Sequence, residues 1–299
     1  DVKGEFRVEE FNWVAAIEYA DSLGVDVINS SLGYTGFNDT TMSYNYSQLD
    51  GQTAFSSRGA NIGASKGMII VNSAGNEGDG PWHYVGTPAD APGVLTVAAV
   101  RPNGQRASFS SWGPTADGRI KPDVAAQGRY TVVASMNKYD VQRTNGTSFS
   151  SPVLAGMVAS LREAFPNLPS ESLKDAIKLS SSQAYLPDSS LGYGIPNFFL
   201  AYLSLIESTV VIDYQDKIYY APIPVKKQLH LLIEQQQEAK IKIEIYNKLM
   251  QQKISYLFDS KGSEIKEIIL KDFSLLKPDI YFIKIGINQK SFWVKMIKE

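Results

Sequence analysis

The residues best suited to chemistry lie in one octapeptide, residues 145–152, which reads NGTSFSSP. A run of small residues that favours a helix follows it, so Ser148 is predicted at the start of a helix. Backbone N–H groups and the helix dipole stabilise developing negative charge at such a position. Gly146 would let a substrate approach the backbone closely. The simpler interpretation is an ordinary helix cap, which serine and threonine often provide.

A second polar segment, residues 73–78 (SAGNEG), directly follows an apolar run at residues 68–72 (MIIVN). If that run is a buried strand, Asn76 lies at the carboxyl edge of a sheet, where α/β proteins place their sites. A neutral amide held by its neighbours can donate a hydrogen bond to an oxyanion. Taken alone, a turn is the better explanation of this segment.

A third segment, residues 31–34 (SLGY), follows another apolar run at residues 25–29 (VDVIN). An extended edge that contains glycine can pair its main chain with a peptide. By itself this segment indicates nothing. The order of the three segments along the chain is the informative feature.

Apolar patterning predicts the elements that must position these segments. Helical patterns occur at residues 9–23, 56–66, 148–165 and 170–181, and buried strands are predicted at residues 25–29, 68–72, 94–100 and 130–134. Continuous apolar strands that alternate with helices are typical of an α/β fold with a parallel sheet.

This order of motifs resembles that of the subtilisin-like serine proteases, the subtilases. The resemblance is carried by segments that include ADSLGVDVINSSLGY at 20–34, SKGMIIVNSAGNEG at 65–78 and NGTSFSSPVLAGMVASL at 145–161. It implies a subtilisin-like α/β fold with helices that flank a parallel sheet. It also implies a serine endopeptidase that acts on proteins or peptides.

The resemblance assigns roles to the three segments. It implies that Ser148 is the nucleophile and that Asn76 donates to the oxyanion together with the Ser148 backbone N–H. It implies that the substrate-binding walls are formed by Ser31, Leu32, Gly33, Ala74 and Gly75. Tyr34 stands where many subtilases have glycine, a departure that bears on the depth of the subsites.

The aspartate and histidine of a subtilase triad are not found. In the family they precede the serine, in Asp-[Ser/Thr]-Gly and His-Gly-Thr contexts, and neither motif occurs here. Only 30 residues precede Ser31, so we expect both partners, and the N-terminal part of the catalytic domain, upstream of Asp1. The resemblance gives neither His83 nor His230 a catalytic role. Without its base Ser148 is a poor nucleophile, so we expect little activity from this chain by itself.

Composition excludes several other classes of site. The 299 residues include no cysteine, which excludes a thiol nucleophile, a cysteine zinc site and a disulfide, and two histidines cannot build a histidine-rich metal site. Subtilases often bind calcium, so the resemblance leaves a structural calcium open, but no acidic loop is distinctive enough to assign its ligands. No cofactor is evident from the sequence. A net charge of −2 gives no general attraction to nucleic acid. No apolar run approaches the roughly 18 residues of a membrane span.

The charge distribution predicts two domains, residues 1–208 and 209–299. The first holds 14 basic and 20 acidic side chains and the second holds 15 and 11, so their net charges are −6 and +4. Eight short alternating patterns predict strands at residues 209–214, 217–220, 228–234, 240–246, 254–258, 264–270, 280–285 and 292–297. Seven or eight strands in about 90 residues indicate a small immunoglobulin-like β-sandwich.

The end of the chain, residues 275–299, resembles the C-terminal sorting domains of the type IX secretion system of Bacteroidota. An IYFIKI pattern at residues 280–285 is followed by a short lysine-rich strand. The resemblance implies the secretion machinery as a partner and a secreted or cell-surface location. Asp279 stands where relatives usually have glycine. The alternative is a generic substrate-binding or stabilising sandwich.

The sequence leaves two functions open. The first is the C-terminal portion of a secreted subtilase, an endopeptidase that forms an acyl-enzyme on Ser148. The second is a non-catalytic subtilase-fold surface or binding protein, or a decayed gene fragment. The missing triad motifs favour the second, whereas the presence of both Ser148 and Asn76 favours the first. A processed fragment that stays associated with its N-terminal piece is a third option.

Overall fold

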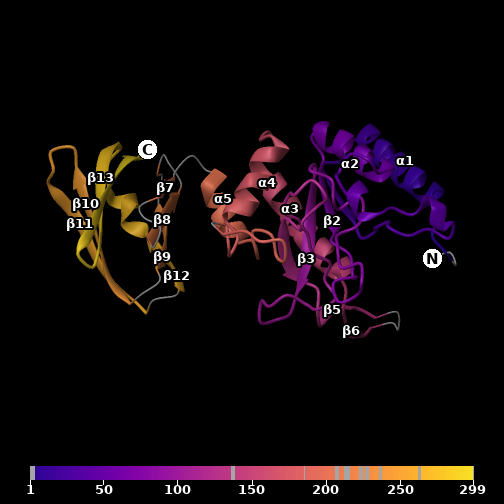
Figure 1. Cartoon of the computed structure of the whole chain (residues 1–299). Helices are drawn as coiled ribbons and strands as arrows, with labels where there is room; N and C mark the ends of the chain where they lie inside the picture. Colours follow the sequence, from indigo (N-terminus) through magenta and orange to yellow (C-terminus); the bar gives the residue numbers. More distant parts are fainter. Residues whose placement is uncertain are drawn as a thin grey trace. The chain divides into compact units, whose positions relative to one another are not determined.

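A computed structural model describes residues 4–135, 139–184, 186–205, 209–211, 216–221, 225, 229–235, 238–261 and 264–298. The chain forms two compact units, residues 1–201 and 202–299 (Figure 1). The division predicted from charge, after residue 208, lies slightly further along the chain. Each unit has its own architecture and is described by itself.

The N-terminal unit contains both helices and strands. Its helices are α1 (Val8–Ser22), η1 (Thr40–Met42), η2 (Tyr46–Gln48), α2 (Phe55–Ser65), α3 (Thr147–Ala164) and α4 (Ser170–Leu179), and α5 (Phe198–Leu205) crosses the border between the units. Its strands are β1 (Val27–Ser30), β2 (Ile69–Ser73), β3 (Val94–Val100), β4 (Val124–Gln127), β5 (Thr131–Ala134) and β6 (Val141–Thr144). In the part of the chain that the structure describes, no helix is long and apolar enough to cross a membrane.

A four-stranded parallel sheet is the framework of this unit, with strand order β1-β2-β3-β4. Every residue of β2 and β3 is buried, and strands buried on both faces require helices on both faces. Helix α2 packs on β2 and β3, and α3 contacts all four strands (Figure 1). The predicted subtilisin-like arrangement of a parallel sheet flanked by helices is therefore confirmed.

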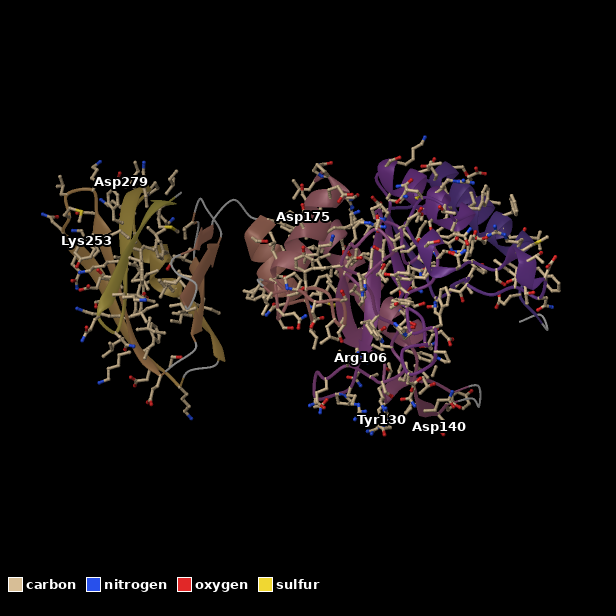
Figure 2. The ribbon with its side chains drawn as sticks, in the orientation of Figure 1. Arg106, Tyr130, Asp140, Asp175, Lys253 and Asp279 are labelled. Atoms are coloured by element: carbon tan, nitrogen blue, oxygen red, sulfur yellow. The ribbon has the colours of Figure 1, made fainter. Side chains whose placement is uncertain are left out.

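One predicted strand of the sheet was wrong. Of the predicted strand at residues 130–134, Thr131–Ala134 form β5, which pairs antiparallel with β6 in a separate hairpin, and the fourth parallel strand is β4. The N–H groups of Gly128 and Arg129 both donate to the Val100 carbonyl, and Tyr130 has a φ of 57°. This turn directs the chain out of the sheet, and Tyr130 and Asp140 flank the hairpin at the surface (Figure 2). Val132 is 57 % exposed, so its apolar character does not reflect burial.

The C-terminal unit consists of two antiparallel four-stranded sheets, with orders β11-β10-β13-β14 and β12-β9-β8-β7. Its elements are β7 (Thr209–Val211), β8 (Asp216–Ala221), β9 (Leu229–Gln235), β10 (Ala239–Asn247), β11 (Gln252–Ser260), β12 (Glu264–Leu270), η3 (Lys271–Leu275), β13 (Asp279–Ile287) and β14 (Lys290–Lys298). Buried side chains of both sheets meet in one apolar core, which includes Ile233, Ile243 and Ile283. Alternation of buried and exposed residues along β10 and β13 accounts for the pattern seen in the sequence.

Candidate active site

Ser148 lies in the first turn of α3, as the sequence predicted. Gly146 precedes the helix with a φ of 149°, in the region that favours glycine, and its N–H donates to the Gly128 carbonyl at 2.8 Å. The Ser148 backbone N–H belongs to the first turn, where N–H groups have no acceptor within the helix. Among the described residues the Ser148 hydroxyl has no hydrogen-bond partner and the side chain is half-buried. The hydroxyl and the backbone N–H are thus both available to a ligand.

Asn76 is held in a defined orientation by Thr147. The Thr147 backbone N–H and hydroxyl donate to Asn76 Oδ1 at 2.9 and 3.0 Å, and the Gly75 N–H donates to the same hydroxyl at 3.2 Å. Because a backbone N–H can only donate, the atom it meets must be the amide oxygen. The exposed Asn76 side chain therefore keeps its Nδ2 free to donate. This is the geometry that an oxyanion donor requires.

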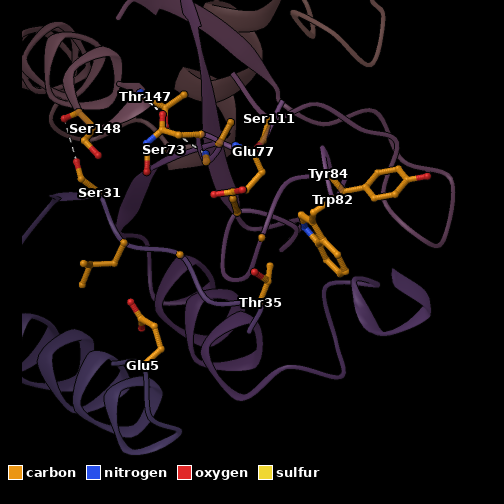
Figure 3. A pocket seen from close by; sticks show the side chains of 17 residues that line it. Glu5, Ser31, Thr35, Ser73, Glu77, Trp82, Tyr84, Ser111, Thr147 and Ser148 are labelled. Carbon is orange, nitrogen blue, oxygen red and sulfur yellow. Dashed lines mark hydrogen bonds between the residues drawn. The ribbon is translucent and has the colours of Figure 1, made fainter. Parts of the chain in front are cut away.

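Residues 31–33, the extended segment that follows β1, are hydrogen-bonded to the start of α3 and to the end of β2. The Ser31 hydroxyl donates to the Ser148 carbonyl at 3.1 Å (Figure 3). Asn72 Nδ2 donates to the Leu32 carbonyl at 3.1 Å. Tyr34 and Thr87 exchange backbone hydrogen bonds of 2.8 and 3.2 Å. These contacts hold residues 31–33 extended beside the end of β2, so their main chain can pair with a peptide.

One cleft of about 250 Å³ brings all seven predicted site residues together. It is lined by Ser31, Leu32, Gly33, Ala74, Gly75, Asn76 and Ser148. The fold adds residues that the sequence did not single out: Glu5, Thr35, Ser73, Glu77, Trp82, Tyr84, Gly86, Ala89, Ser111 and Thr147. Glu77 and Thr147 lie inside the motifs at residues 73–78 and 145–152, so the sequence could have predicted them as lining residues. Glu5 and Trp82 reach the cleft through tertiary structure alone.

Neither histidine is seen at the cleft. The His83 ring lies 4.3 Å from that of Trp112 and 4.0 Å from that of Tyr84, and it is absent from the described lining residues. His230 lies in β9, in the C-terminal unit, and its side chain is outside the described residues. Among the residues that the structure describes, none lining the cleft can act as an imidazole base.

Two buried aspartates of the N-terminal unit, Asp90 and Asp123, have structural contacts. Asp123 pairs with Lys121 at 2.6 Å, and Asp90 accepts hydrogen bonds from the Ser57 hydroxyl and the Gly51 N–H. Burial raises the pKa of the Asp90 carboxyl, although these two hydrogen bonds oppose the shift. Both side chains are buried, and neither is among the described residues that line the cleft.

Within the described ranges, no three of the side chains of histidine, cysteine, aspartate and glutamate come together in a group that could hold a metal ion.

A comparison with family models matches residues 2–194 to the model described as the subtilase family, Peptidase_S8. The chain belongs to the subtilase family. The motifs that the sequence pointed to therefore lie in a subtilase domain, and the fold described above is that of a subtilase.

Curated relatives support this membership. The subtilase is 34 % identical over 177 residues to subtilisin DY of Bacillus licheniformis, and 32 % identical over 182 residues to subtilisin E of Bacillus subtilis. These matches cover 59 % and 60 % of this chain and 56 % and 42 % of those proteins. The chain thus spans about half the length of the curated relatives it matches.

Solved structures share the fold at lower sequence identity. The self-cleaved protease domain of PatA matches with a TM-score of 0.53 and 22 % identity, over 66 % of this chain and 68 % of that one. The prenylagaramide maturation protease PagA matches with a TM-score of 0.51 and 24 % identity, over 64 % and 66 % of the two chains. At these identities the likeness concerns the fold alone.

Proposed function

We propose that this subtilase is a serine endopeptidase that cleaves peptide bonds in proteins through an acyl-enzyme on Ser148. The observation that carries the proposal is the joint orientation of Ser148 and Asn76 in one cleft. A free serine hydroxyl and two oxyanion donors, the Ser148 N–H and the Asn76 amide, face the same space. A helix cap or a turn alone would not require this combination.

The reaction follows from these groups. Ser148 Oγ attacks the scissile carbonyl carbon, and its proton passes to a base. The carbonyl oxygen becomes an oxyanion that accepts hydrogen bonds from Asn76 Nδ2 and the Ser148 N–H. The C–N bond then breaks as the base returns the proton to the leaving amine, and water hydrolyses the ester in a second cycle. The edge at residues 31–33 holds the peptide extended during both cycles.

The base is the group that the described cleft does not supply. Proton removal is needed because a serine hydroxyl is a weak nucleophile near neutral pH. We propose that a histidine, oriented by an aspartate, comes from a part of the protein beyond these 299 residues. Without it, oxyanion stabilisation and binding would retain only about 10³–10⁴ of acceleration over water.

A fluorophosphonate probe applied to the full gene product tests the proposal. We expect covalent labelling at Ser148 and none in Ser148→Ala, with Ser150→Ala, a buried serine of the same helix, as the matched control that keeps its label. Asn76→Ala should lower kcat by about 10²–10³, the loss typical of an oxyanion donor in a subtilisin. If the full product remains unlabelled although folded, the catalytic proposal is wrong.

The second candidate is a non-catalytic subtilase-fold protein that binds partners through the same cleft. The lack of a triad histidine among the described cleft residues favours it. It predicts that the full product binds peptides without cleaving them. The probe experiment separates the two candidates, because an inert cleft gives no labelling at Ser148.

We further propose that residues 209–299 are an immunoglobulin-like sorting domain recognised by a type IX secretion machine, which would deliver the protein to the cell surface or medium. The support is the sequence pattern of residues 275–299, which in the structure forms the neighbouring antiparallel strands β13 and β14. Along β14, buried residues alternate with exposed ones, and the exposed positions include lysines. Such a surface fits recognition by another protein as well as a stabilising role.

Deletion of residues 275–299 tests this second proposal in a Bacteroidota host. We expect the truncated protein to stay inside the cell envelope while the full protein reaches the surface or medium. A host that lacks the secretion machine should retain both. If the truncated protein is exported as efficiently as the full protein, the sandwich has another role.

A further inference from the structure

Asn72 is a buried polar residue at the point where two strands of the sheet separate. The parallel pairing of β1 with β2 ends at Ser30 and Asn72. Beyond this point, residues 31–33 and residues 73–75 line the cleft, and we call them its first and second walls. Asn72 itself is fully buried and is not among the described residues that line the cleft. The three residues before it in β2 are isoleucine, isoleucine and valine, so an apolar side chain would be the ordinary choice here.

The Asn72 side chain joins the two walls. Its Nδ2 donates to the Leu32 carbonyl at 3.1 Å and to the Ser73 carbonyl at 2.8 Å. An amide nitrogen carries two hydrogens, so one side chain supplies both donors. The opposite orientation would turn the amide oxygen toward two carbonyl oxygens, which can only accept. The amide nitrogen of Asn72 therefore faces the walls.

Packing alone does not explain a polar residue at this position. Asn72 Oδ1 is buried and accepts no hydrogen bond within the described part of the chain. A buried acceptor without a partner costs free energy, and leucine, which has a similar shape, would not carry that cost. The hydrogen bonds that the amide makes to the two walls are the feature that leucine could not reproduce.

The first wall has free backbone groups for a substrate. The N–H and C=O of Gly33 have no hydrogen-bond partner among the described residues, and Gly33 is exposed. The Ser31 hydroxyl binds the start of this wall to the Ser148 carbonyl at 3.1 Å, and Asn72 binds its middle, at Leu32, to the second wall. The position of the free Gly33 groups therefore depends on the Asn72 amide.

We propose that Asn72 is a positioning residue that sets the spacing between the two walls, and that it thereby determines how tightly the cleft holds the main chain of an extended substrate. The inference rests on the proposed peptidase function and adds a residue outside the cleft to its substrate-binding machinery. Asn72 acts through Leu32 and Ser73. Without its amide, both carbonyls lose a donor and the first wall loses its link to the second.

Two alanine substrates test the inference with the full gene product, because alanine offers a substrate-binding cleft little besides its main chain. An oligoalanine amide is long enough to pair with the first wall, whereas acetylalanine methyl ester reaches Ser148 but offers little main chain for pairing. Asn72→Leu should raise KM for the oligoalanine amide about tenfold and leave kcat nearly unchanged, because it removes binding that is equal in the ground and transition states. KM for the ester and the rate of fluorophosphonate labelling at Ser148 should stay as they are. A rise in KM that is equal for both substrates, or no rise, overturns the inference.

Asn61→Leu on α2 is the matched control. The Asn61 amide donates to the Gly51 carbonyl at 2.8 Å and accepts from the Gly93 N–H at 3.0 Å, so this variant also loses two hydrogen bonds between segments. None of these three residues is among the described lining residues of the cleft, so KM for the oligoalanine amide should not change. Asn72→Ser serves if leucine prevents folding. A folded serine variant with the KM of the wild type for the oligoalanine amide would show that the inference is wrong.

Binding to the 299-residue chain separates this inference from the proposed function. An oligoalanine peptide is titrated by calorimetry, which needs no catalysis. A Kd that is about tenfold weaker in Asn72→Leu and unchanged in Asn61→Leu supports the inference even if Ser148 is never labelled by the probe. The same Kd in the wild type and in Asn72→Leu overturns the inference while the peptidase proposal stands.

Discussion

At the scale of single residues, the orientation of Asn76 matters more than its presence. An asparagine in a turn could direct either its oxygen or its nitrogen toward a substrate. Here Thr147 binds the oxygen twice, and so the nitrogen is left for the ligand. Thr147 is thus a positioning residue that acts through Asn76.

Thr147→Val removes one of the two hydrogen bonds to Asn76 Oδ1 and leaves the Gly75 N–H without its acceptor. We expect kcat of the full gene product to fall about tenfold with little change in KM, because a misplaced donor weakens stabilisation of the transition state. A double-mutant cycle provides the check. In an Asn76→Ala background, Thr147→Val should lower kcat hardly any further. A further fall in kcat of about tenfold would show that Thr147 acts independently of Asn76.

At the scale of elements, a buried charge cluster joins β4 to α4. Asp123, at the start of β4, pairs with Lys121 at 2.6 Å and with Lys178 of α4 at 3.4 Å, and it accepts from the Thr96 N–H. Burial by itself would raise the pKa of the Asp123 carboxyl, but the two lysines and the hydrogen bonds outweigh it and hold the pKa below its ordinary value. Burial lowers the pKa of Lys121 to about 8, so it still carries charge at neutral pH.

Asp123→Asn should destabilise the N-terminal unit by about 3–5 kcal/mol at pH 7, because it leaves the buried Lys121 ammonium and the half-buried Lys178 ammonium without their carboxylate partner. The native pKa lies below the unfolded value of 3.8, so the ionised carboxylate contributes its full stabilisation above about pH 4. That contribution is lost as the pH falls through the native pKa. Denaturant titrations should therefore give a constant difference between the wild type and the variant down to about pH 4 and a narrowing difference below it.

The matched control is Asp21→Asn on α1, whose carboxylate is solvent-exposed and lies 3.9 Å from Lys66. It should change the free energy of unfolding by less than about 0.5 kcal/mol at any of these pH values. A difference for Asp123→Asn that stays constant to pH 2 would contradict the assignment of the effect to ionisation.

At the scale of the whole molecule, the chain holds separate apolar cores. Among the described residues, the core of the C-terminal unit consists of residues between Ile218 and Met296, and that of α1 and α2 is built from residues such as Trp13, Ile17 and Ile70. Since each unit buries its own apolar surface, we expect each to unfold as its own cooperative transition.

Ile243→Ala tests this expectation in the intact 299-residue chain. Ile243 is fully buried in the sandwich core, so its truncation should cost about 2–5 kcal/mol. Calorimetry should show one transition lowered and the other unchanged. Leu257→Ala, on the neighbouring strand but 67 % exposed, should shift neither. A single transition that moves as a whole would show that the units unfold together.

The sequence by itself determined the features that depend on local pattern. Apolar strands, a helix start at residues 147–148 and eight alternating strands follow from the spacing of side chains along the chain, and motif order was enough to indicate a subtilase. The hairpin at residues 131–144 was misjudged because an apolar pair of valines does not reveal whether it is buried. The short strand at Val124–Gln127 was missed because its assignment depends on pairing with β3.

Only the tertiary structure decided the contents of the cleft. Glu5 is separated from Ser148 by most of the N-terminal unit in sequence. The Asp-Gly-Pro run at residues 79–81 predicts a turn before Trp82 but not the place of Trp82 at the cleft. Within the described ranges the Trp82 indole N–H has no hydrogen-bond partner. No local pattern encodes this state, because it depends on all the atoms around the ring. A hydrogen bond requires an acceptor at about 3 Å in a suitable direction, and such proximity is set by the packing of distant segments rather than by their order along the chain.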